Sequence, residues 1–291
     1  MDAGKLYRAK IPDEQVSWQP SDAILYALGI GMAGANGLDG GRELSREVRG
    51  FLYEKDLAVM PTFANVLGPQ LFWTGDKDFG INWKHLLHAE QRLVIHQPLS
   101  ASGNARVRSR VNGIRDKGSQ RGALVFQEKV LEDRDTGQVL ASVGMALWLR
   151  GDGGCGDQGE APEALPSLPE RRPDLGIALL ATHGLPFVYR LSGDLNPLHV
   201  DEDIAREAGF ERPILHGLCT MGLVCHALLK QFCSYRPEKL RELSLRFSQA
   251  VCTGDRLRLE CWEEGGGLIR FRVKNSNNGA LVIDRGLARI H

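Results

Sequence analysis

The stretch that decides the fold is ILHGLCTMGLVCHALLKQF, residues 214–232. Its apolar side chains recur at the spacing of one face of an α-helix, and its glycines allow close approach of neighbouring segments. The pattern predicts a long helix with a buried apolar face. The residues on that face are Leu218, Met221, Cys225, Leu228, Leu229 and Phe232.

Four short stretches of alternating or continuous apolar character follow this helix. Glycine-containing turns separate them, at Thr253-Gly254, at 265–267 and at 277–279. Short apolar runs bounded by such turns are typical of strands joined by hairpins. The second part of the chain is therefore predicted to be a helix followed by an antiparallel meander. The stretches are LSLRFSQAV, DRLRLECWEE, LIRFRVKN and ALVIDRGLARI.

The first part of the chain repeats this order. A candidate helix around PTFANVLGPQ (61–70) precedes four candidate strands at 90–99, 104–114, 123–133 and 138–150. Glycine-bearing strands of any meander look alike, but a repeat of about half the chain with coincident positions favours duplication. The coincident pairs are Gly137 with Gly279, Gly144 with Gly286, and Ala146 with Ala288.

A segment rich in glycine, proline and charge separates the two parts. We expect a first half at 1–150, a linker at 151–175 and a second half at 176–291. Each half must bury one face of its helix and one face of its sheet, which favours an α+β fold with the sheet wrapped around the helix. Pairing the two sheets edge to edge would cover strand edges that otherwise invite association.

Composition excludes several classes of function. Lys plus Arg and Asp plus Glu number 36 each and form no dense basic block, so we expect no nucleic acid partner. Apolar runs fall short of the roughly 18 residues that cross a bilayer, so we expect no membrane partner. The N-terminus lacks a signal-peptide pattern, and the six cysteines form no CxxC pair. We therefore expect a cytoplasmic protein with reduced cysteines.

The densest polar constellation is YRLSGDLNPLHVDEDIAREAGFERPILHGLCTMG, residues 189–222. Gly193 is a natural helix end, Asn196-Pro197 favours a turn, and Asp201 can cap a short helix. This context predicts that Asp194 and His199 are held on an ordered loop.

A carboxylate and an imidazole five residues apart across a turn can converge on one water and exchange a proton with it. The alternative is that Asp and Asn beside a turn only bond the local backbone. His199 and Asp201 also resemble part of a metal site, but a third ligand at a recognisable spacing is missing, so we expect no metal.

His216 and Gly217 open the long helix, where free backbone N–H groups could receive a developing oxyanion. An equally good interpretation is that Gly217 serves only close packing. No serine elbow, phosphate-binding loop or dinucleotide fingerprint stands in a strand-to-helix context, so we expect chemistry without a cofactor.

The segments YRLSGDLNPLH and AGFERPILHGLCTMG resemble the type 2, or R-specific, enoyl-CoA hydratases of the MaoC-like group, and most closely the hydratase domain of peroxisomal multifunctional enzyme type 2. FLYEKDLAVMPTF, LLHAEQRLVIHQPL and RDKGS resemble the first half of that domain, so the resemblance covers nearly the whole chain. It implies a double hot-dog fold, two tandem helix-in-antiparallel-sheet repeats, and a homodimer. It also implies reversible syn hydration of trans-2-enoyl-CoA to (3R)-3-hydroxyacyl-CoA in fatty acid metabolism, including β-oxidation, without metal or cofactor.

The resemblance implies the catalytic residues. Asp194 and His199 match the catalytic aspartate and histidine, and Asn196 is placed to hold this dyad or the water. Gly217 matches the position whose backbone N–H polarises the thioester carbonyl. Glu54 falls where the family has a glutamate important for activity. From the sequence alone, an equally good interpretation is that Glu54 is a solvent-exposed charge without a catalytic role.

The resemblance also places His88, Ala89, Lys117 and Phe247 at substrate-contacting positions. A lysine such as Lys117 supplies a point charge suited to the phosphates of CoA. Ala89 replaces a glycine common in the family, and Glu202 replaces a proline. These departures affect the fit of the substrate more than the chemistry.

The first half has no copy of the Asp-to-His loop. We expect this half to be non-catalytic and to leave room for a long or bulky acyl chain, which predicts activity on medium or longer enoyl-CoAs. Three alternatives stay open: a 3-hydroxyacyl-thioester dehydratase in a synthetic or branched-chain pathway, a non-catalytic acyl-CoA-binding protein, and a thioesterase.

Overall fold

A computed structural model describes residues 1–34, 44–69, 77–82 and 86–291 of the chain. Its larger strands are β2 (Leu86–Ile95), β3 (Gly103–Asp116), β4 (Ala123–Asp133), β5 (Val139–Leu149), β8 (Leu240–Phe247), β9 (Arg256–Glu263), β10 (Leu268–Asn275) and β11 (Leu281–Ile290). Shorter ones are β1 (Glu14–Trp18), β6 (Gln158–Gly159) and β7 (Leu175–Leu180). These eight larger strands correspond to the eight predicted ones.

The helices lie beside the sheet, and the long helix at 217–232 packs against it. The α-helices are α1 (Ala3–Tyr7), α2 (Pro20–Gly29), α3 (Arg46–Arg49), α4 (Leu185–Tyr189), α5 (Glu202–Glu207) and α6 (Gly217–Phe232). The 3₁₀ helices are η1 (Pro61–Asn65), η2 (Lys77–Phe79), η4 (Arg190–Ser192), η5 (Pro197–His199) and η6 (Pro237–Lys239). In the parts of the chain that the structure describes, no helix has both the length and the apolar character needed to cross a lipid bilayer.

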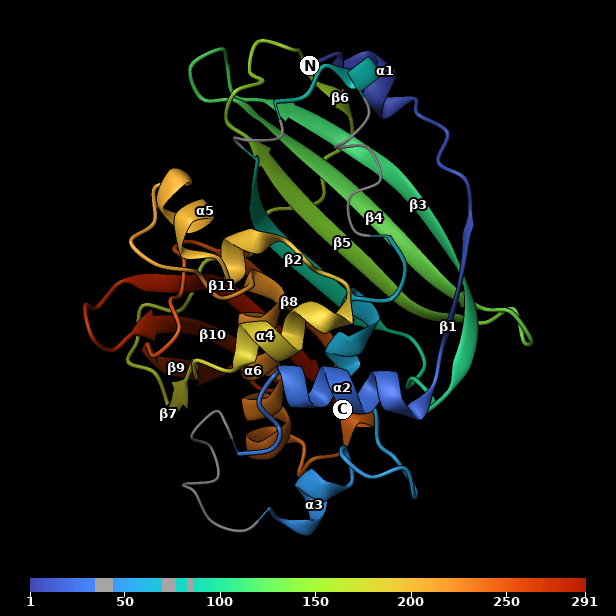
Figure 1. Cartoon of the computed structure of the whole chain (residues 1–291), viewed down its shortest axis with the longest axis vertical. Coiled ribbons are helices and arrows are strands. Elements are labelled where there is room, and N and C mark those ends of the chain that lie inside the picture. The colour runs from blue at the N-terminus through green and yellow to red at the C-terminus, as the bar shows by residue number, and fades with distance from the viewer. Residues whose placement is uncertain (35–43, 70–76, 83–85) are drawn as a thin grey trace.

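All the strands belong to one antiparallel sheet, in the order β1-β3-β4-β5-β2-β8-β11-β10-β9-β7, with β6 paired to β3. Outward from the β2–β8 junction, the first half has the order β2-β5-β4-β3-β1 and the second half has the order β8-β11-β10-β9-β7. The two halves therefore have the same topology. Figure 1 shows the green strands of the first half continuing into the red-brown strands of the second through this junction. The pairing there runs from Glu90 opposite Arg246 to Val94 opposite Glu242. The α+β double hot-dog fold is confirmed, and the halves do pair edge to edge.

Glycines that coincide in sequence occupy equivalent places. Gly137 and Gly279 lie in the β4–β5 and β10–β11 hairpins with φ of 70° and 74°, a region that glycine adopts without strain. Gly144 and Gly286 lie within β5 and β11. At Gly286 a Cβ atom would come within 2.3 Å of the Phe271 ring, so only glycine fits there. The equivalences support duplication.

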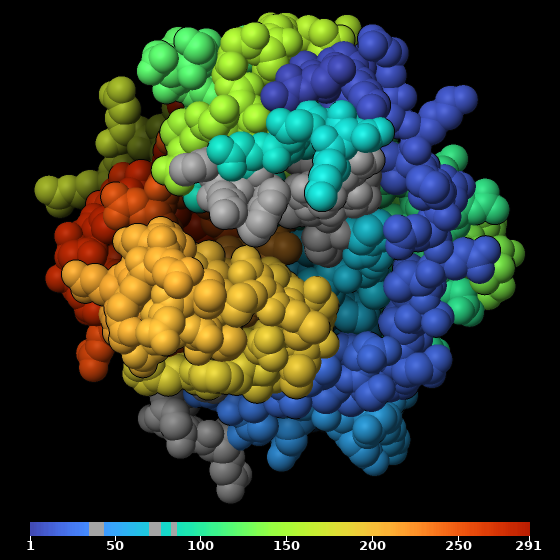
Figure 2. Space-filling view, turned by 45° about the horizontal axis from the view of Figure 1, so that its top comes forward, coloured from blue at the N-terminus to red at the C-terminus, as the bar shows by residue number. Residues whose placement is uncertain are grey.

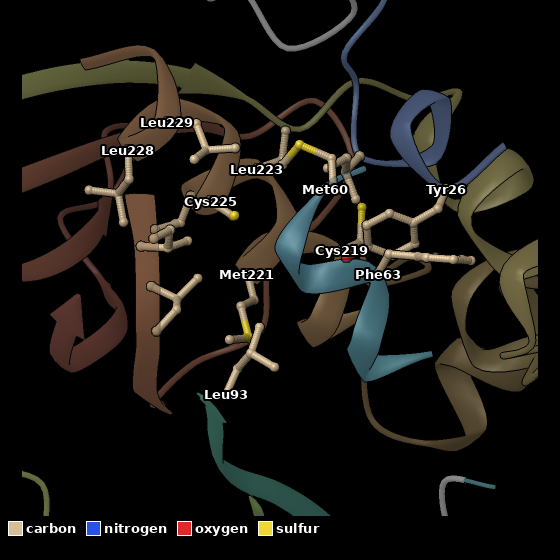
Figure 3. Packing of buried hydrophobic residues seen from close by; sticks show 14 of the residues in the cluster. Tyr26, Met60, Phe63, Leu93, Cys219, Met221, Leu223, Cys225, Leu228 and Leu229 are labelled. Atoms are coloured by element: carbon tan, nitrogen blue, oxygen red, sulfur yellow. The ribbon is translucent and has the colours of Figure 1, made fainter. Parts of the chain in front are cut away.

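Helix α6 is the centre of the core. Every residue from 219 to 229 is buried, so burial extends all round the helix and not only over the predicted face. Figure 3 shows why: Met221 points toward Leu93 of β2, whereas Tyr26, Met60 and Phe63 pack on another side of the helix. The sheet and the N-terminal segments thus enclose α6 between them.

The predicted helix at 61–70 is largely wrong. The structure forms only the five-residue 3₁₀ helix η1, and residue 70 lies outside the described residues. Gly68 ends this turn with a φ of 74°, and a Cβ atom there would come within 2.9 Å of Val107. Helix α2, which the sequence reading did not identify, packs beside η1 through the rings of Tyr26 and Phe63, 5.5 Å apart.

The segment between the halves lies along strands of both: β6 pairs with β3 of the first half, and the residues around Leu165 lie against β10 and β11 of the second. Apart from β6 it is irregular, and Leu165 is its buried apolar residue. Arg270 of β10 donates to the carbonyls of Pro166 and Ser167, and Arg285 of β11 donates to that of Leu165. Side chains from the sheet therefore hold this segment in place.

Candidate active site

The loop between η4 and α5 carries the predicted dyad and is ordered by its own side chains. Gly193 ends η4 with a φ of 116°, a conformation that other residues rarely adopt. Asp194 Oδ1 accepts from Asn196 N at 3.3 Å, and Asn196 Oδ1 accepts from Leu198 N at 3.1 Å. Asn196 therefore makes the local backbone bond that the alternative interpretation of this residue expected, and it shapes the loop on which Asp194 and His199 lie.

Asp201 caps helix α5, as predicted. Its side chain accepts from the backbone N–H groups of Asp203 at 2.9 Å and Ile204 at 3.1 Å. This cap fixes the end of the loop. The Asp201 carboxylate, which resembled part of a metal site in the sequence, is thus used as a helix cap.

Three side chains converge at the loop. Asp194, His199 and His216 each offer one polar atom, and these atoms lie within 4.8 Å of one another. His199 and His216 are 8% and 1% exposed, whereas Asp194 keeps access to solvent. We call these three residues the Asp-His-His cluster. His216 was not among the predicted catalytic residues, although its place beside Gly217, at the start of a buried helix within the same motif, could have indicated it.

Backbone carbonyls decide which nitrogens of the two imidazoles carry protons. His199 Nδ1 lies 2.8 Å from Ile214 O, and His216 Nε2 lies 3.2 Å from Asp194 O. A carbonyl only accepts hydrogen bonds, so both of these nitrogens donate. The Nε2 atom of a neutral His199 is therefore left with a lone pair that can take up a proton.

The two imidazoles are stacked, with ring centroids 3.7 Å apart and planes inclined by 29°. Burial lowers the pKa of His199, against the opposing effects of Ile214 O and the Asp194 carboxylate. Burial and the adjacent His199 lower the pKa of His216 to about 4. Both rings are therefore neutral at pH 7, and the cluster contains a base that can accept a proton.

The cluster offers a carboxylate and two imidazoles, which is a common set of metal ligands. Imidazole nitrogens bind a metal along a lone pair in the plane of the ring. His199 Nδ1 and His216 Nε2 already donate to carbonyls, which leaves one nitrogen of each ring for a metal or for a proton. The expectation of chemistry without a metal therefore stays a prediction.

Helix α6 begins at Gly217, directly after His216, and the side chain of this N-cap residue makes no capping hydrogen bond. The first N–H groups of a helix lack partners within it and lie at its positive end. Phe247 covers this position, since a Cβ atom on Gly217 would come within 3.3 Å of the ring. Close packing against Phe247 and a backbone N–H at the positive end of the helix therefore coexist at Gly217.

His88 lies on the other side of Phe247, edge-on to its ring with centroids 4.9 Å apart. Its Nε2 donates to Glu90 O at 3.1 Å. Burial lowers the pKa of His88 to about 4, although the negative charge of Asp194 opposes the shift. The structure thus brings His88 and Phe247 together next to the start of α6.

Ala89 lies at a break in strand pairing. The β2–β5 register shifts between His88 and Glu90, and β2 pairs with β8 only from Glu90 onward. Such an unpaired residue is a β-bulge, a feature that often redirects a neighbouring side chain beside an active site. The bulge at Ala89 therefore adjoins the site through its neighbour His88.

Lys117 is exposed in the turn between β3 and β4, where its N–H donates to Gly122 O at 2.8 Å. Strand register places this turn at the end of the sheet where β2 begins, close to Leu86. Three strand spacings separate β3 from β2, which is about 14 Å. Lys117 is thus at the same end of the sheet as His88 but does not join the cluster.

Glu54 lies apart from the other predicted residues. It is exposed in a turn after Phe51, whose ring packs 6.3 Å from that of Tyr235. Tyr235 follows the C-terminal end of α6 and bonds back to Leu229, whereas Gly217 begins this helix. The structure does not bring Glu54 to the cluster, and its importance for activity stays a prediction.

A cavity of about 250 Å³ opens beside the loop. Strand β1 contributes Trp18, α2 contributes Leu25, the segment after η1 contributes Leu67, and Leu191 and Gly193 precede Asp194. In Figure 2 the gold segment that carries the loop borders the blue N-terminal residues on the same face. The cavity therefore lies between the first half of the chain and the residues that lead into the cluster.

Comparisons with known proteins agree with the fold and with the family resemblance. Residues 17–151 match the family model described as MFE-2 hydratase 2 N-terminal domain, and residues 169–284 match the MaoC like domain. The chain is 34% identical to the enoyl-CoA hydratase ChsH3 of Mycobacterium tuberculosis over 282 residues, with 94% of each chain covered.

Two further comparisons extend this similarity. The chain is 36% identical to the 3-hydroxyacyl-thioester dehydratase Y of Mycobacterium tuberculosis over 275 residues, 92% of this chain and 91% of that one. The crystal structure of a MaoC-like dehydratase from Phytophthora capsici superposes with a TM-score of 0.87 at 27% identity, covering 100% of this chain and 98% of that one. The protein therefore belongs to the MaoC-like family, in the group of the type 2 enoyl-CoA hydratases.

Proposed function

We propose that this protein is an R-specific enoyl-CoA hydratase, a hydro-lyase that adds water reversibly across the double bond of a trans-2-enoyl-CoA to give the (3R)-3-hydroxyacyl-CoA. The observation that carries the proposal is the convergence of Asp194 and His199, within 4.8 Å, next to the start of α6. Relatives named as an enoyl-CoA hydratase and a 3-hydroxyacyl-thioester dehydratase support the same chemistry.

In the proposed mechanism, the dyad of Asp194 and His199 binds one water molecule. The water oxygen bonds to C3 while one of its protons passes to His199 Nε2, which has its lone pair free. The dyad returns one proton to C2 on the same face, so addition is syn. The N–H of Gly217 binds the thioester oxygen and stabilises the enolate that forms between the two steps.

The remaining site residues are assigned to substrate binding. His88, Ala89 and Phe247 would contact the thioester end of the substrate, because they lie beside Gly217. Lys117 would contact CoA phosphate, since it is exposed at the same end of the sheet. Asn196 would hold the dyad in place through the loop geometry described above.

The two halves would divide the work. Residues 176–291 carry the chemistry, 151–175 link the halves, and 1–150 accommodate the acyl chain without catalysis. The cavity between Trp18, Leu67 and Gly193 supports this division, because it leads from the first half to the residue before Asp194. We expect it to take acyl chains of medium or greater length.

A dehydratase acting on 3-hydroxyacyl thioesters is the alternative that a specific observation favours, since one similar protein carries that name. The same residues catalyse both directions, so the two functions differ in the thioester carrier and in the metabolites supplied. A non-catalytic binder would give no role to an ordered Asp-His dyad, and a thioesterase differs from a hydratase in that it releases free CoA.

The test mixes the purified protein with trans-2-enoyl-CoAs of increasing chain length. We expect loss of the conjugated thioester absorbance, a product of R configuration and no release of free CoA thiol. Activity confined to the shortest substrate would contradict the proposed acyl cavity. Thiol release would instead identify a thioesterase, and acyl-CoA binding without turnover would identify a binder.

We also propose that the protein is a cytoplasmic homodimer that serves fatty acid β-oxidation. Light scattering on the purified protein tests the homodimer, and a monomer at micromolar concentration would contradict it. Fractionation of cells that express the protein tests the cytoplasmic location. Loss of growth on fatty acids after deletion tests the pathway.

A further inference from the structure

Lys129 of β4 is a buried amine that the proposed reaction does not use. Its side chain belongs to a residue that is 4% exposed, and Nζ donates to Asn65 O and Leu67 O, each at 2.7 Å. These carbonyls lie at the end of η1, where a helix leaves its carbonyl groups without partners. Burying a lysine is costly, so this contact is unlike the solvated lysines of the surface.

Two further polar contacts hold the same turn. Gln91 Nε2 of β2 donates to Asn65 Oδ1 at 3.0 Å, and Asn65 Nδ2 donates to Met221 Sδ of α6 at 3.5 Å. Asn65 and Gln91 are both fully buried. Together with Lys129 they tie η1 to β4, to β2 and to α6.

The turn needs these ties because it is short. Helix η1 precedes β2 as α6 precedes β8, but it has 5 residues where α6 has 16. A helix this short has too few hydrogen bonds to be stable by itself. Polar contacts from neighbouring elements therefore hold η1 in the place where the second half has a long helix.

The tied segment forms one wall of the cavity beside the cluster. Phe63, Val66 and Leu67 line it, together with Leu191 and Gly193 from the segment before Asp194. Lys129 binds the carbonyl of Leu67 itself. The position of this wall, relative to the loop that carries Asp194, thus depends on the contact made by Lys129.

We propose that Lys129 is a positioning residue that determines acyl-chain specificity: by holding the carbonyls of Asn65 and Leu67, it sets the wall of the cavity that receives the distal part of the acyl chain. Lys129 touches neither the substrate's reacting atoms nor the cluster. The inference rests on the proposed hydratase function.

The environment of the amine agrees with this role. Burial lowers the pKa of Lys129 to about 7, and the Glu14 carboxylate only partly opposes the shift. Its amine donates to two carbonyls of the cavity wall, and these bonds form whether the amine is charged or neutral.

The test compares Lys129→Met, which has a similar length but no donor, with Lys129→Gln, which keeps an amide donor. Exposed Lys10 provides the matched control, Lys10→Met. We measure kcat/KM for crotonyl-CoA and for trans-2-decenoyl-CoA, and the Kd of butyryl-CoA and decanoyl-CoA by calorimetry. The saturated thioesters have no double bond to hydrate, so their binding is measured whether or not the protein is a hydratase.

We expect Lys129→Met to lower kcat/KM for the decenoyl substrate about tenfold more than for the crotonyl substrate, a usual scale for a change in apolar contacts at a pocket. The ratio of kcat/KM for the decenoyl substrate to kcat/KM for the crotonyl substrate should be partly restored in Lys129→Gln. The same ratio should be unchanged in Lys10→Met. An equal loss for both substrates would overturn the inference, because it would indicate a general structural role.

The two proposals can fail separately. If the wild-type protein hydrates neither substrate, the hydratase function fails, and the ratio of the two Kd values still decides the role of Lys129. If Lys129→Met does not fold, the Lys129→Gln variant decides: a lowered ratio supports the inference, and an unchanged ratio overturns it.

Discussion

Replacing Asp194 by asparagine removes one negative charge from the Asp-His-His cluster and keeps the shape of the side chain. The charge matters most when His199 has taken a proton and become cationic. The interacting atoms lie no more than 4.8 Å apart. At an effective dielectric constant of about 20, the lost attraction is about 3.5 kcal/mol. This corresponds to roughly 300-fold in rate.

We therefore expect Asp194→Asn to lower kcat roughly 300-fold, within the range of about 10²-fold to 10⁴-fold seen for general acid–base groups. KM should change by less than about threefold, because the lost interaction belongs to the transition state. An asparagine Oδ1 can still accept from Asn196 N, so the loop should keep its shape.

The assay follows the disappearance of the conjugated enoyl thioester under saturating substrate. Asp201→Asn is the matched control: it removes the same charge seven residues away, on a residue whose capping role asparagine can fill. It should leave kcat within about twofold. A kcat of Asp194→Asn within tenfold of wild type, with the fold intact by circular dichroism, would refute the assignment of Asp194.

Two further predictions concern the cluster, and a third concerns the packing of α6. His216→Phe keeps a flat ring for stacking on His199 but cannot donate to Asp194 O; one neutral hydrogen bond is worth about 1 kcal/mol, so we expect kcat to fall about fivefold to tenfold in the hydration assay, and an unchanged kcat would contradict it. Burial lowers the pKa of His199 from its ordinary 6.5, so the base stays neutral below that pH; the acid limb of log kcat/KM against pH should lie below 6.5, and a limb above it would argue against His199 as the base. Met221→Ala empties part of the packing between α6 and β2, which should lower the free energy of unfolding by about 2 to 5 kcal/mol in urea titrations; a loss under about 1 kcal/mol would show that the surroundings collapse into the space.

The sequence was informative wherever neighbours along the chain determine the structure. Alternating apolar residues and glycine turns indicated the eight larger strands, because strand faces and hairpins depend on residues close together in sequence. The same holds for α6 and for the cap at Asp201. Asp194 and His199 could be paired from sequence because five residues and one turn separate them.

The error at η1 has a physical cause. The apolar spacing of 61–70 is compatible with a helix, but Gly68 adopts a left-handed φ against Val107 of β3. The segment also packs against α2 and is held by Lys129 of β4. These constraints come from other parts of the chain, and local periodicity does not contain them.

By itself, then, the sequence determined the α+β class, the repeated order of strands, the central helix and the loop with its dyad. Only the tertiary structure decided that His216, 22 residues from Asp194, stacks on His199 and bonds the Asp194 carbonyl. It also decided that Lys129 reaches back 64 residues to Asn65, and that Glu54 lies apart from the cluster. The physical reason is that periodicity, caps and turns arise from interactions over a few residues, whereas contacts between distant segments depend on how the sheet closes around α6.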